Sequence, residues 1–251
     1  MSTNQLTTPF SEYTAPKNEL IYELIEKQRY GVEYQPMICM RSGDIVAYEA
    51  LARFYTADNQ LISPITVFDF LHSDMSQLRK VEYELKKLQI EYAPAEYELF
   101  INVDPHAVGQ DVDLENDPLI MQLLDRPNLI VELIENSDIH DARAALTLHN
   151  ILKAKGVQTA LDDIGADHAL LSLEILSLVN YLKFDLSWIN KIQKHRYAFL
   201  FRSMLEFARQ SNKPSILEGI ENEAMLNTAK HYNLDRVQGF HYRTLFQSVK
   251  P

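Results

Sequence analysis

The feature that most limits the fold is a regular alternation of short apolar segments with longer amphipathic ones along most of the chain. The spacing of apolar residues predicts strands over residues 97–103, 128–135, 157–165, 180–189, 213–221 and 234–242, and helices over residues 63–93, 118–125, 141–156, 168–179, 195–212 and 222–233. Strands that alternate with helices in this way are typical of a largely parallel sheet covered on both faces. A (β/α)8 barrel is therefore the first choice for this α/β chain, and an open doubly wound sheet is the second.

The chain before residue 63 follows a different pattern. Residues 1–20 are polar and contain proline, which predicts a flexible tail, and one folded domain is expected over residues 21–251. A helical stripe over residues 18–31 is followed by two strand-like segments, residues 32–40 and 45–54, which a Ser-Gly-Asp turn joins. Two strands that so short a turn connects are expected to form an antiparallel hairpin.

Composition narrows the possible partners. The formal net charge is −11, so the surface as a whole is expected to repel nucleic acid polymers and anionic membranes. Cys39 is the one cysteine, which excludes a disulfide within the chain and a cysteine-rich zinc site. The first 20 residues lack the apolar core of a signal peptide, and no apolar run reaches the length of a membrane span. The sequence thus predicts a cytoplasmic protein.

Charged residues stand where the expected strands end. Glu49 is the first example, because it closes the apolar run AYE. It lies within the strand-like segment 45–54, where an unpaired charge is disfavoured. The later strands carry polar residues at the same end: Asn102, Asp104, Glu132, Glu135, Asp162, Asp163, Lys183, Asp185, Glu218, Glu221 and Gln238. In a barrel the carboxyl ends of parallel strands meet on one face, so these side chains are expected to lie together.

Clustered carboxylates need positive charge, because each one raises the pKa of its neighbours. Carboxylates and an Asn amide suit a hard ion such as Mg²⁺ or Mn²⁺, and the adjacent Asp162 and Asp163 could reach two ions. Two-metal sites of this kind typically hydrolyse phosphate esters, and Lys183 would orient a water or neutralise phosphate charge. Taken singly, each acid also has an ordinary alternative as a helix N-cap or a surface charge.

Seven short motifs resemble the EAL domain, the bacterial phosphodiesterase module for cyclic di-GMP. The first is Glu49-Ala50-Leu51, within the segment YQPMICMRSGDIVAYEALARF, and it corresponds to the tripeptide that names the family. The others follow in the family's order along the chain and are INV, ELIE, LDDIG, LKFD, LEGIE and VQGF. The resemblance extends from about Tyr34 to Phe246, which is nearly the whole expected domain.

The resemblance implies a modified TIM barrel in which one early strand runs antiparallel, in agreement with the expected hairpin. It also implies hydrolysis of cyclic di-GMP to linear pGpG, with two Mg²⁺ or Mn²⁺ ions as cofactors and Ca²⁺ as an inhibitor. Homodimers are usual in the family, and its outputs are motility and biofilm control. The implied metal ligands are Glu49, Asn102, Glu132, Asp162 and Asp163.

Further roles are implied for residues around these ligands. Lys183 would hold the attacking water, and Glu218 would be either a general base or a ligand of the second ion. With two ions lowering the pKa of the water, a dedicated base is less necessary. The remaining implied roles are contact with the substrate or water by Gln35, Arg53 and Gln238, and support of the ligands by Glu135, Asp185 and Glu221.

One loop departs from the family pattern. After the paired aspartates the family reads roughly Phe-Gly-Thr-Gly, whereas this chain reads Ile164-Gly165-Ala166-Asp167. Asp adopts a positive φ less easily than Gly, so activity or its regulation could be altered. Three hypotheses stay open. An active phosphodiesterase is favoured by the complete set of ligands. A catalytically impaired receptor for cyclic di-GMP or protein-interaction module is supported by the loop alone, and a different metal-assisted barrel hydrolase is disfavoured by the ordered motifs.

Two expectations concern helices rather than the site. The charge-rich helix from Gln77 to Tyr92 is predicted to present a solvated face. Trp188 is predicted to pack against a helix, and Leu205 is predicted to belong to the core.

Overall fold

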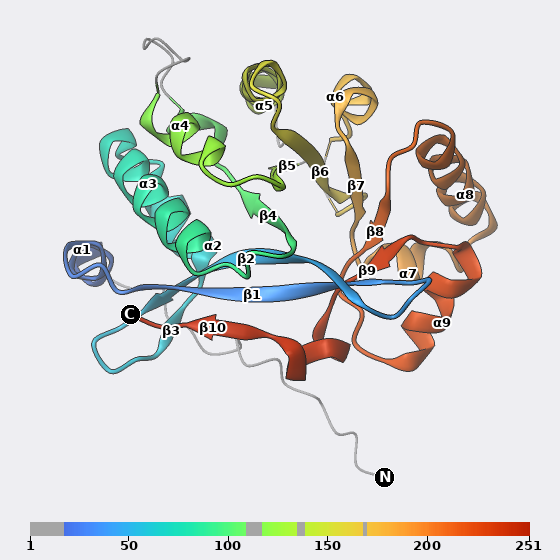
Figure 1. The fold of residues 1–251 in the computed structure, drawn as a ribbon, viewed down its shortest axis with the longest axis horizontal. Coiled ribbons are helices and arrows are strands. Elements are labelled where there is room, and N and C mark those ends of the chain that lie inside the picture. Colours follow the sequence, from blue (N-terminus) through green and yellow to red (C-terminus); the bar gives the residue numbers. More distant parts are fainter. Residues whose placement is uncertain (1–17, 109–116, 135–138, 168–169) are drawn as a thin grey trace.

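A computed structural model describes residues 18–108, 117–134, 139–167 and 170–251. Helices surround a closed barrel of strands (Figure 1). The barrel strands are β1 (Tyr30–Cys39), β2 (Ile45–Tyr55), β4 (Glu98–Asn102), β5 (Leu129–Ile134), β6 (Gln158–Ile164), β7 (Tyr181–Phe184), β8 (Ser215–Leu217) and β9 (Arg236–Val237). The predicted modified TIM barrel is thus confirmed.

β1 is the reversed strand of the barrel. It pairs antiparallel with β2 on one side and with β9 on the other, whereas the remaining neighbours, from β2 through β4 to β9, pair in parallel. The hairpin of β1 and β2 places Gln35 opposite Glu49. Its turn contains Gly43 at a φ of +80°, a conformation that glycine adopts without strain. The predicted hairpin and the single antiparallel strand are both present.

Apolar side chains fill the barrel one layer below its carboxyl end. They form a separate buried cluster with one residue from each of β1, β2 and β4 to β8: Met37, Ala47, Phe100, Ile130, Ala160, Tyr181 and Ile216. Side chains two positions apart on a strand point to the same face. The polar residues two positions after six of these therefore point into the barrel one layer higher: Glu49, Asn102, Glu132, Asp162, Lys183 and Glu218.

The outer ring consists of α2 (Pro64–Leu71), α3 (Met75–Glu91), α4 (Pro118–Leu124), α5 (Ile139–Ala154), α6 (Leu173–Leu178), α8 (His195–Gln210) and α9 (Glu223–Tyr232), and α1 (Asn18–Glu26) precedes the first strand. Their apolar faces and the outward faces of the strands form the larger core cluster. Trp188 stacks on Phe201 of α8 with ring centroids 4.9 Å apart, and Leu205 is buried, as predicted. No helix in the described ranges is both long and apolar enough to cross a membrane.

Several boundaries differ from the prediction. The helix expected over residues 63–93 is divided, because the Asp74 carboxylate accepts the N–H groups of Ser76 and Gln77 and so begins α3 as a new helix. The helix expected over residues 168–179 is limited to α6 within the described residues, and the strand expected over residues 180–189 ends at Phe184, before the short helix α7 (Trp188–Lys191). The strand expected over residues 234–242 is the short β9, followed by a 3₁₀ helix over Phe240–Leu245. The edge strands β3 (Leu61–Ile62) and β10 (Gln247–Val249) have no counterpart in the prediction.

The charge-rich face of α3 is partly buried, so the predicted solvated face is wrong there. Glu82 and Lys86 are each only 2 % exposed and form an ion pair of 2.9 Å. Gln89 is buried as well, and its Nε2 donates to the carbonyl of Ala50 at 2.6 Å. Charged and amide groups are tolerated inside because they are paired with each other or with the backbone.

Candidate metal centre

Lys183 lies at the centre of the polar layer. Its side chain is fully buried, and its Nζ forms ion pairs with four carboxylates. Nζ lies 2.8 Å from Asp162 Oδ1, 2.9 Å from Glu218 Oε1 and 3.3 Å from Glu49 Oε2, and Glu132 Oε1 is the fourth partner. One ammonium among four carboxylates leaves the cluster with an excess of negative charge wherever the acids are ionised.

Two amides hold Glu49 between its neighbours. Asn102 Nδ2 donates to Glu132 Oε2 at 2.9 Å and to Glu49 Oε1 at 3.3 Å. Gln238 Nε2 donates to Glu49 Oε2 at 2.5 Å and to Glu218 Oε1 at 2.9 Å. Since Glu49 is 4 % exposed, these bonds and Lys183 compensate for the loss of its hydration.

Burial and mutual repulsion raise the pKa values of several acids. Loss of solvent raises the pKa of Glu132 and of Glu218 well above the ordinary range, and neighbouring carboxylates add to the effect. Burial, followed by the charge of Asp162, raises the pKa of Asp163 to about 7. Burial by itself would lower the pKa of Lys183, but the surrounding carboxylates outweigh it and raise that pKa. The cluster is therefore one that additional positive charge would stabilise.

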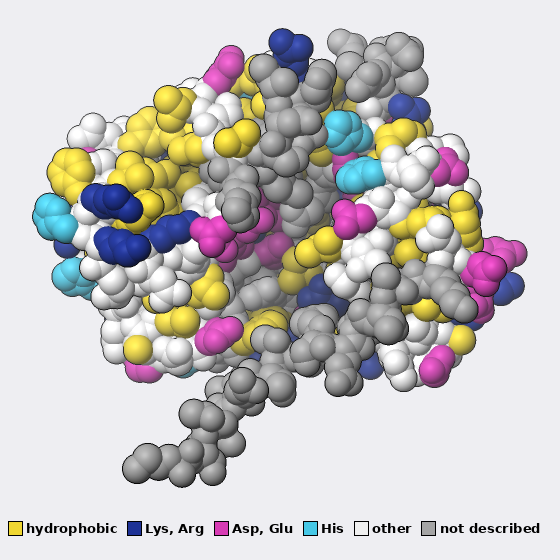
Figure 2. Space-filling view, turned by 180° about the vertical axis from the view of Figure 1, so that it is seen from behind, with side chains coloured by type: hydrophobic (Ala, Val, Ile, Leu, Met, Phe, Trp, Pro, Cys, Tyr) yellow, Lys and Arg dark blue, Asp and Glu magenta, His cyan; other side chains and the backbone are white. Residues whose placement is uncertain are grey.

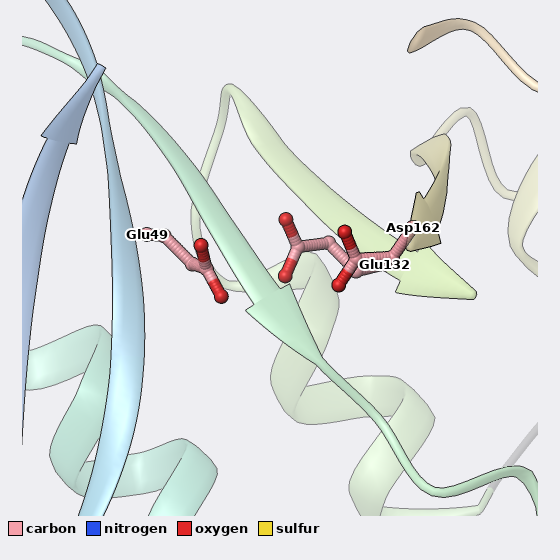
Figure 3. Close-up of side chains that lie close together, drawn as sticks. All are labelled: Glu49, Glu132 and Asp162. Carbon is pink, nitrogen blue, oxygen red and sulfur yellow. The ribbon is translucent and has the colours of Figure 1, made fainter. Parts of the chain in front are cut away.

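Two overlapping groups of acids suit divalent cations. Oxygens of Glu49, Glu132 and Asp162 lie within 4.8 Å of one another, and so do oxygens of Asp162, Asp163 and Glu218. Figure 3 shows the side chains of the first group, which approach one another from β2, β5 and β6. Glu132 Oε1 and Asp162 Oδ1 are buried, and each lies beside the Lys183 ammonium without a further hydrogen bond, so each retains a lone pair for a cation. A set of oxygen donors suits a hard divalent cation, and Asp162 belongs to both groups.

The acids open into a cavity of about 430 Å³ at the carboxyl end of the barrel. Gln35, Asp185, Glu221 and Gln238 also line it, so the structure brings these predicted residues together with the acids. Asp185 accepts the backbone N–H of Ser187 at 2.8 Å, which fixes the chain directly after β7. Glu135, the remaining predicted supporting residue, lies outside the described residues.

Arg53 lines a neighbouring cavity of about 470 Å³, which shares Leu51 and Asn102 with the first. Its Nη2 lies 2.7 Å from Glu33 Oε1, and Arg243 Nη1 lies 2.9 Å from the same oxygen. Burial raises the pKa of Glu33, but the two guanidinium groups outweigh burial and lower it. The sequence prediction missed Glu33 as the partner of Arg53. The available signal was a glutamate in an apolar strand, two positions before Gln35 and hence on the same face.

The sequence matches the family model of the EAL domain over residues 18–244. An uncharacterized protein of Mycobacterium tuberculosis is 28% identical over 229 residues, which are 86% of this chain and 36% of that protein. The bifunctional diguanylate cyclase/cyclic di-GMP phosphodiesterase MucR of Pseudomonas aeruginosa is 25% identical over 235 residues, which are 88% of this chain and 34% of MucR. The chain thus spans about a third of the length of these relatives.

Solved structures of EAL proteins share the fold. The PaMucR phosphodiesterase in complex with c-di-GMP has a TM-score of 0.68 and 22% identity, and the alignment covers 88% of this chain and 94% of that one. The FimX EAL domain of Pseudomonas aeruginosa bound to c-di-GMP has a TM-score of 0.70 and 20% identity, with 89% and 93% covered. An EAL domain protein of Listeria monocytogenes has a TM-score of 0.71 and 21% identity, with 92% and 94% covered. At these identities the likeness shows a common fold.

Proposed function

Because the chain belongs to the EAL domain family, we propose that it is a phosphodiesterase that hydrolyses cyclic di-GMP to linear pGpG. In this reaction the oxygen of a water adds to one phosphorus, the bond from that phosphorus to the ribose 3′ oxygen breaks, and the 3′ oxygen leaves with a proton. The observation that carries the proposal is the pair of overlapping acid groups around Lys183, at the carboxyl end of the barrel. The c-di-GMP complexes of PaMucR and FimX support the choice of ligand.

The proposal includes two Mg²⁺ or Mn²⁺ ions as cofactors. Divalent ions at such a site lower the pKa of a bound water and withdraw charge from the phosphate. The excess of clustered carboxylates over the single Lys183 ammonium supports this donor set. The residues proposed to hold the ions are Glu49, Asn102, Glu132, Asp162 and Asp163.

The other side chains would orient the reactants. Lys183, buried among the acids, would hold the attacking water by a hydrogen bond, and Glu218, whose pKa is raised, would accept its proton or bind the second ion. Arg53, fixed by Glu33, would contact a phosphate of the substrate. The remaining proposed roles are substrate contact by Gln35 and Gln238, and support of the ligands by Glu135, Asp185 and Glu221.

The family membership extends the proposal to the setting of the reaction. We expect a cytoplasmic homodimer that Ca²⁺ inhibits, since Ca²⁺ accepts more ligands at longer distances than Mg²⁺. Each of these expectations can fail without affecting the choice of substrate.

Turnover by the purified chain tests the proposal. Cyclic di-GMP is incubated with the protein and Mg²⁺ or Mn²⁺, and pGpG is measured by chromatography. Wild type and Glu91→Ala, which removes an exposed glutamate at the end of α3, are expected to form pGpG. Glu49→Ala and Glu49→Gln are expected to lose activity by at least about 100-fold, because a ligand of the ion is lost.

The outcomes separate the alternatives. If the folded wild-type protein binds cyclic di-GMP but forms no pGpG with either ion, the chain is a receptor and the enzymatic proposal is wrong. If it also fails to bind the nucleotide, a protein-interaction module on the same barrel remains.

A further inference from the structure

The turn that follows the paired aspartates has an unusual backbone. Residues 162–167 form this turn, the aspartate turn. Asp163 has a φ of +54° and Gly165 a φ of +86°, so two of its residues lie in the left-handed region. A left-handed residue other than glycine costs about 1–2 kcal/mol, and such a conformation persists where the surrounding structure holds it. The direction of the Asp163 side chain therefore depends on whatever fixes this turn.

The segment after β7 holds the middle of the aspartate turn. Trp188 Nε1 donates to the carbonyl of Ile164 at 2.7 Å, and the backbone N–H of Asp185 donates to the same carbonyl at 3.2 Å. The indole packs so closely that a Cβ added at Gly165 would lie 2.4 Å from its Nε1. Glycine is therefore required at this position both for its φ and for the space.

Lys191 of α7 holds the far end of the aspartate turn. Its Nζ donates to the carbonyl of Gly165 and, at 3.0 Å, to Ser187 Oγ. The same Nζ lies 3.0 Å from Asp167 Oδ1, and Ser187 Oγ donates to the Gly165 carbonyl at 3.0 Å. One ammonium thus joins a carbonyl and a carboxylate of the turn to the helix that follows β7. Asp167 also stands where the family pattern has a glycine.

We propose that Lys191 is a positioning residue for the second cation subsite, the one formed by Asp162, Asp163 and Glu218, with Asp167 as its counter-charge. Lys191 fixes the aspartate turn at Gly165, and the turn holds Asp163 in its left-handed conformation. That conformation directs the Asp163 carboxylate toward its two partners in the subsite. The proposal rests on the proposed function only in that these acids bind cations.

Binding of Mn²⁺ to the full chain, followed by the electron paramagnetic resonance signal of the free ion, tests the proposal without turnover. Lys191→Met should weaken the second of two Mn²⁺ ions by about 10–100-fold, the usual effect of losing a supporting contact, and the first by less than about twofold. Lys191→Arg, which keeps the cation, should restore most of the affinity. Lys194→Met, which removes an exposed charge three residues away, should behave as wild type.

Two controls address folding and the turn itself. Circular dichroism and urea unfolding identify a variant that does not fold. Asp167→Asn is a milder change, because it removes only the counter-charge of Lys191. It should weaken the binding of the second Mn²⁺ by about two- to fivefold. Hydrogen exchange of the Ala166 amide, which donates to the Asp163 carbonyl at 2.9 Å, should become faster in Lys191→Met without any metal.

The results distinguish this proposal from the proposed function. If Lys191→Met binds both ions as wild type does, or weakens both equally, Lys191 does not position the second subsite. If wild type binds no second Mn²⁺, the two-metal site is wrong and the role of Lys191 is wrong with it. If wild type binds two ions but does not hydrolyse cyclic di-GMP, the proposed activity is wrong. The Lys191 variants then still decide whether Lys191 positions the second subsite.

Discussion

Replacing Asp163 by Asn should stabilise the cation-free protein at alkaline pH. Burial and the charge of Asp162 raise the pKa of Asp163 from 3.8 to about 7 in the folded state. Between these two values the folded protein keeps a proton that the unfolded chain has released. The free energy of unfolding therefore falls as the pH rises through this window and is constant above it.

The size of the effect follows from the shift. One pH unit corresponds to about 1.36 kcal/mol for a single group, so the raised pKa of Asp163 costs about 4 kcal/mol of stability at pH 8 and about 2 kcal/mol at pH 5. The difference in stability between Asp163→Asn and wild type should therefore grow by about 2–3 kcal/mol from pH 5 to pH 8. Asn suits the test because it carries no charge and tolerates a φ of +54°, which Ala does not.

The assay is urea unfolding of both proteins in EDTA at several pH values, followed by circular dichroism. A difference that does not change with pH would show that Asp163 ionises normally in the folded protein, and the account of the site would be wrong. Saturating Mn²⁺ should reverse the order of stability at pH 8, because a bound cation favours the carboxylate of wild type.

Three further predictions test other contacts. Lys183→Met should lower the free energy of unfolding by about 3–5 kcal/mol at pH 7.5 in EDTA, because four carboxylates lose their shared ammonium; a loss below about 1 kcal/mol in urea unfolding would contradict this. Gly165→Ala should lower the free energy of unfolding by about 2–4 kcal/mol, measured by thermal unfolding. Gly43→Ala, at a similar φ but with no neighbouring atom within 4 Å, should lower it by about 1 kcal/mol. Equal losses would show that only φ matters. Glu33→Gln should weaken cyclic di-GMP binding in Ca²⁺ by about tenfold in calorimetry, because the guanidinium of Arg53 loses its charged partner, and an unchanged affinity would exclude this role.

The barrel and its central acids could be predicted from the sequence because both depend on local patterns. Strands and helices differ in the period of their apolar residues, and the period of two within a strand places Glu49 above Ala47 and Glu132 above Ile130. Lys183 follows the same rule above Tyr181. A polar residue two positions after an inward-facing apolar residue can thus be predicted from the sequence to point into the barrel.

The supporting contacts could not be predicted, because they join segments that no local pattern relates. Lys191 meets the carbonyl of Gly165, 26 residues earlier, only after α7 has packed against the aspartate turn. Glu33 meets Arg53 across the hairpin in a pairing that depends on the register of β1 and β2. The helical period of α3 likewise gives no sign that Glu82 is buried, since the surface that covers it belongs to other elements.

The reversed strand β1 has a consequence for the order of folding. Ile38 pairs with Val237, so one edge of β1 can pair only after about 200 further residues have been synthesised. At a synthesis rate of about 5–20 residues per second, that edge stays unpaired on the ribosome for roughly 10–40 s. The hairpin with β2 can form early, but its other side presents open backbone groups to neighbouring nascent chains. Ring closure by β9 is therefore a late and non-local step, and the interval before it is when this barrel is most exposed to misassembly.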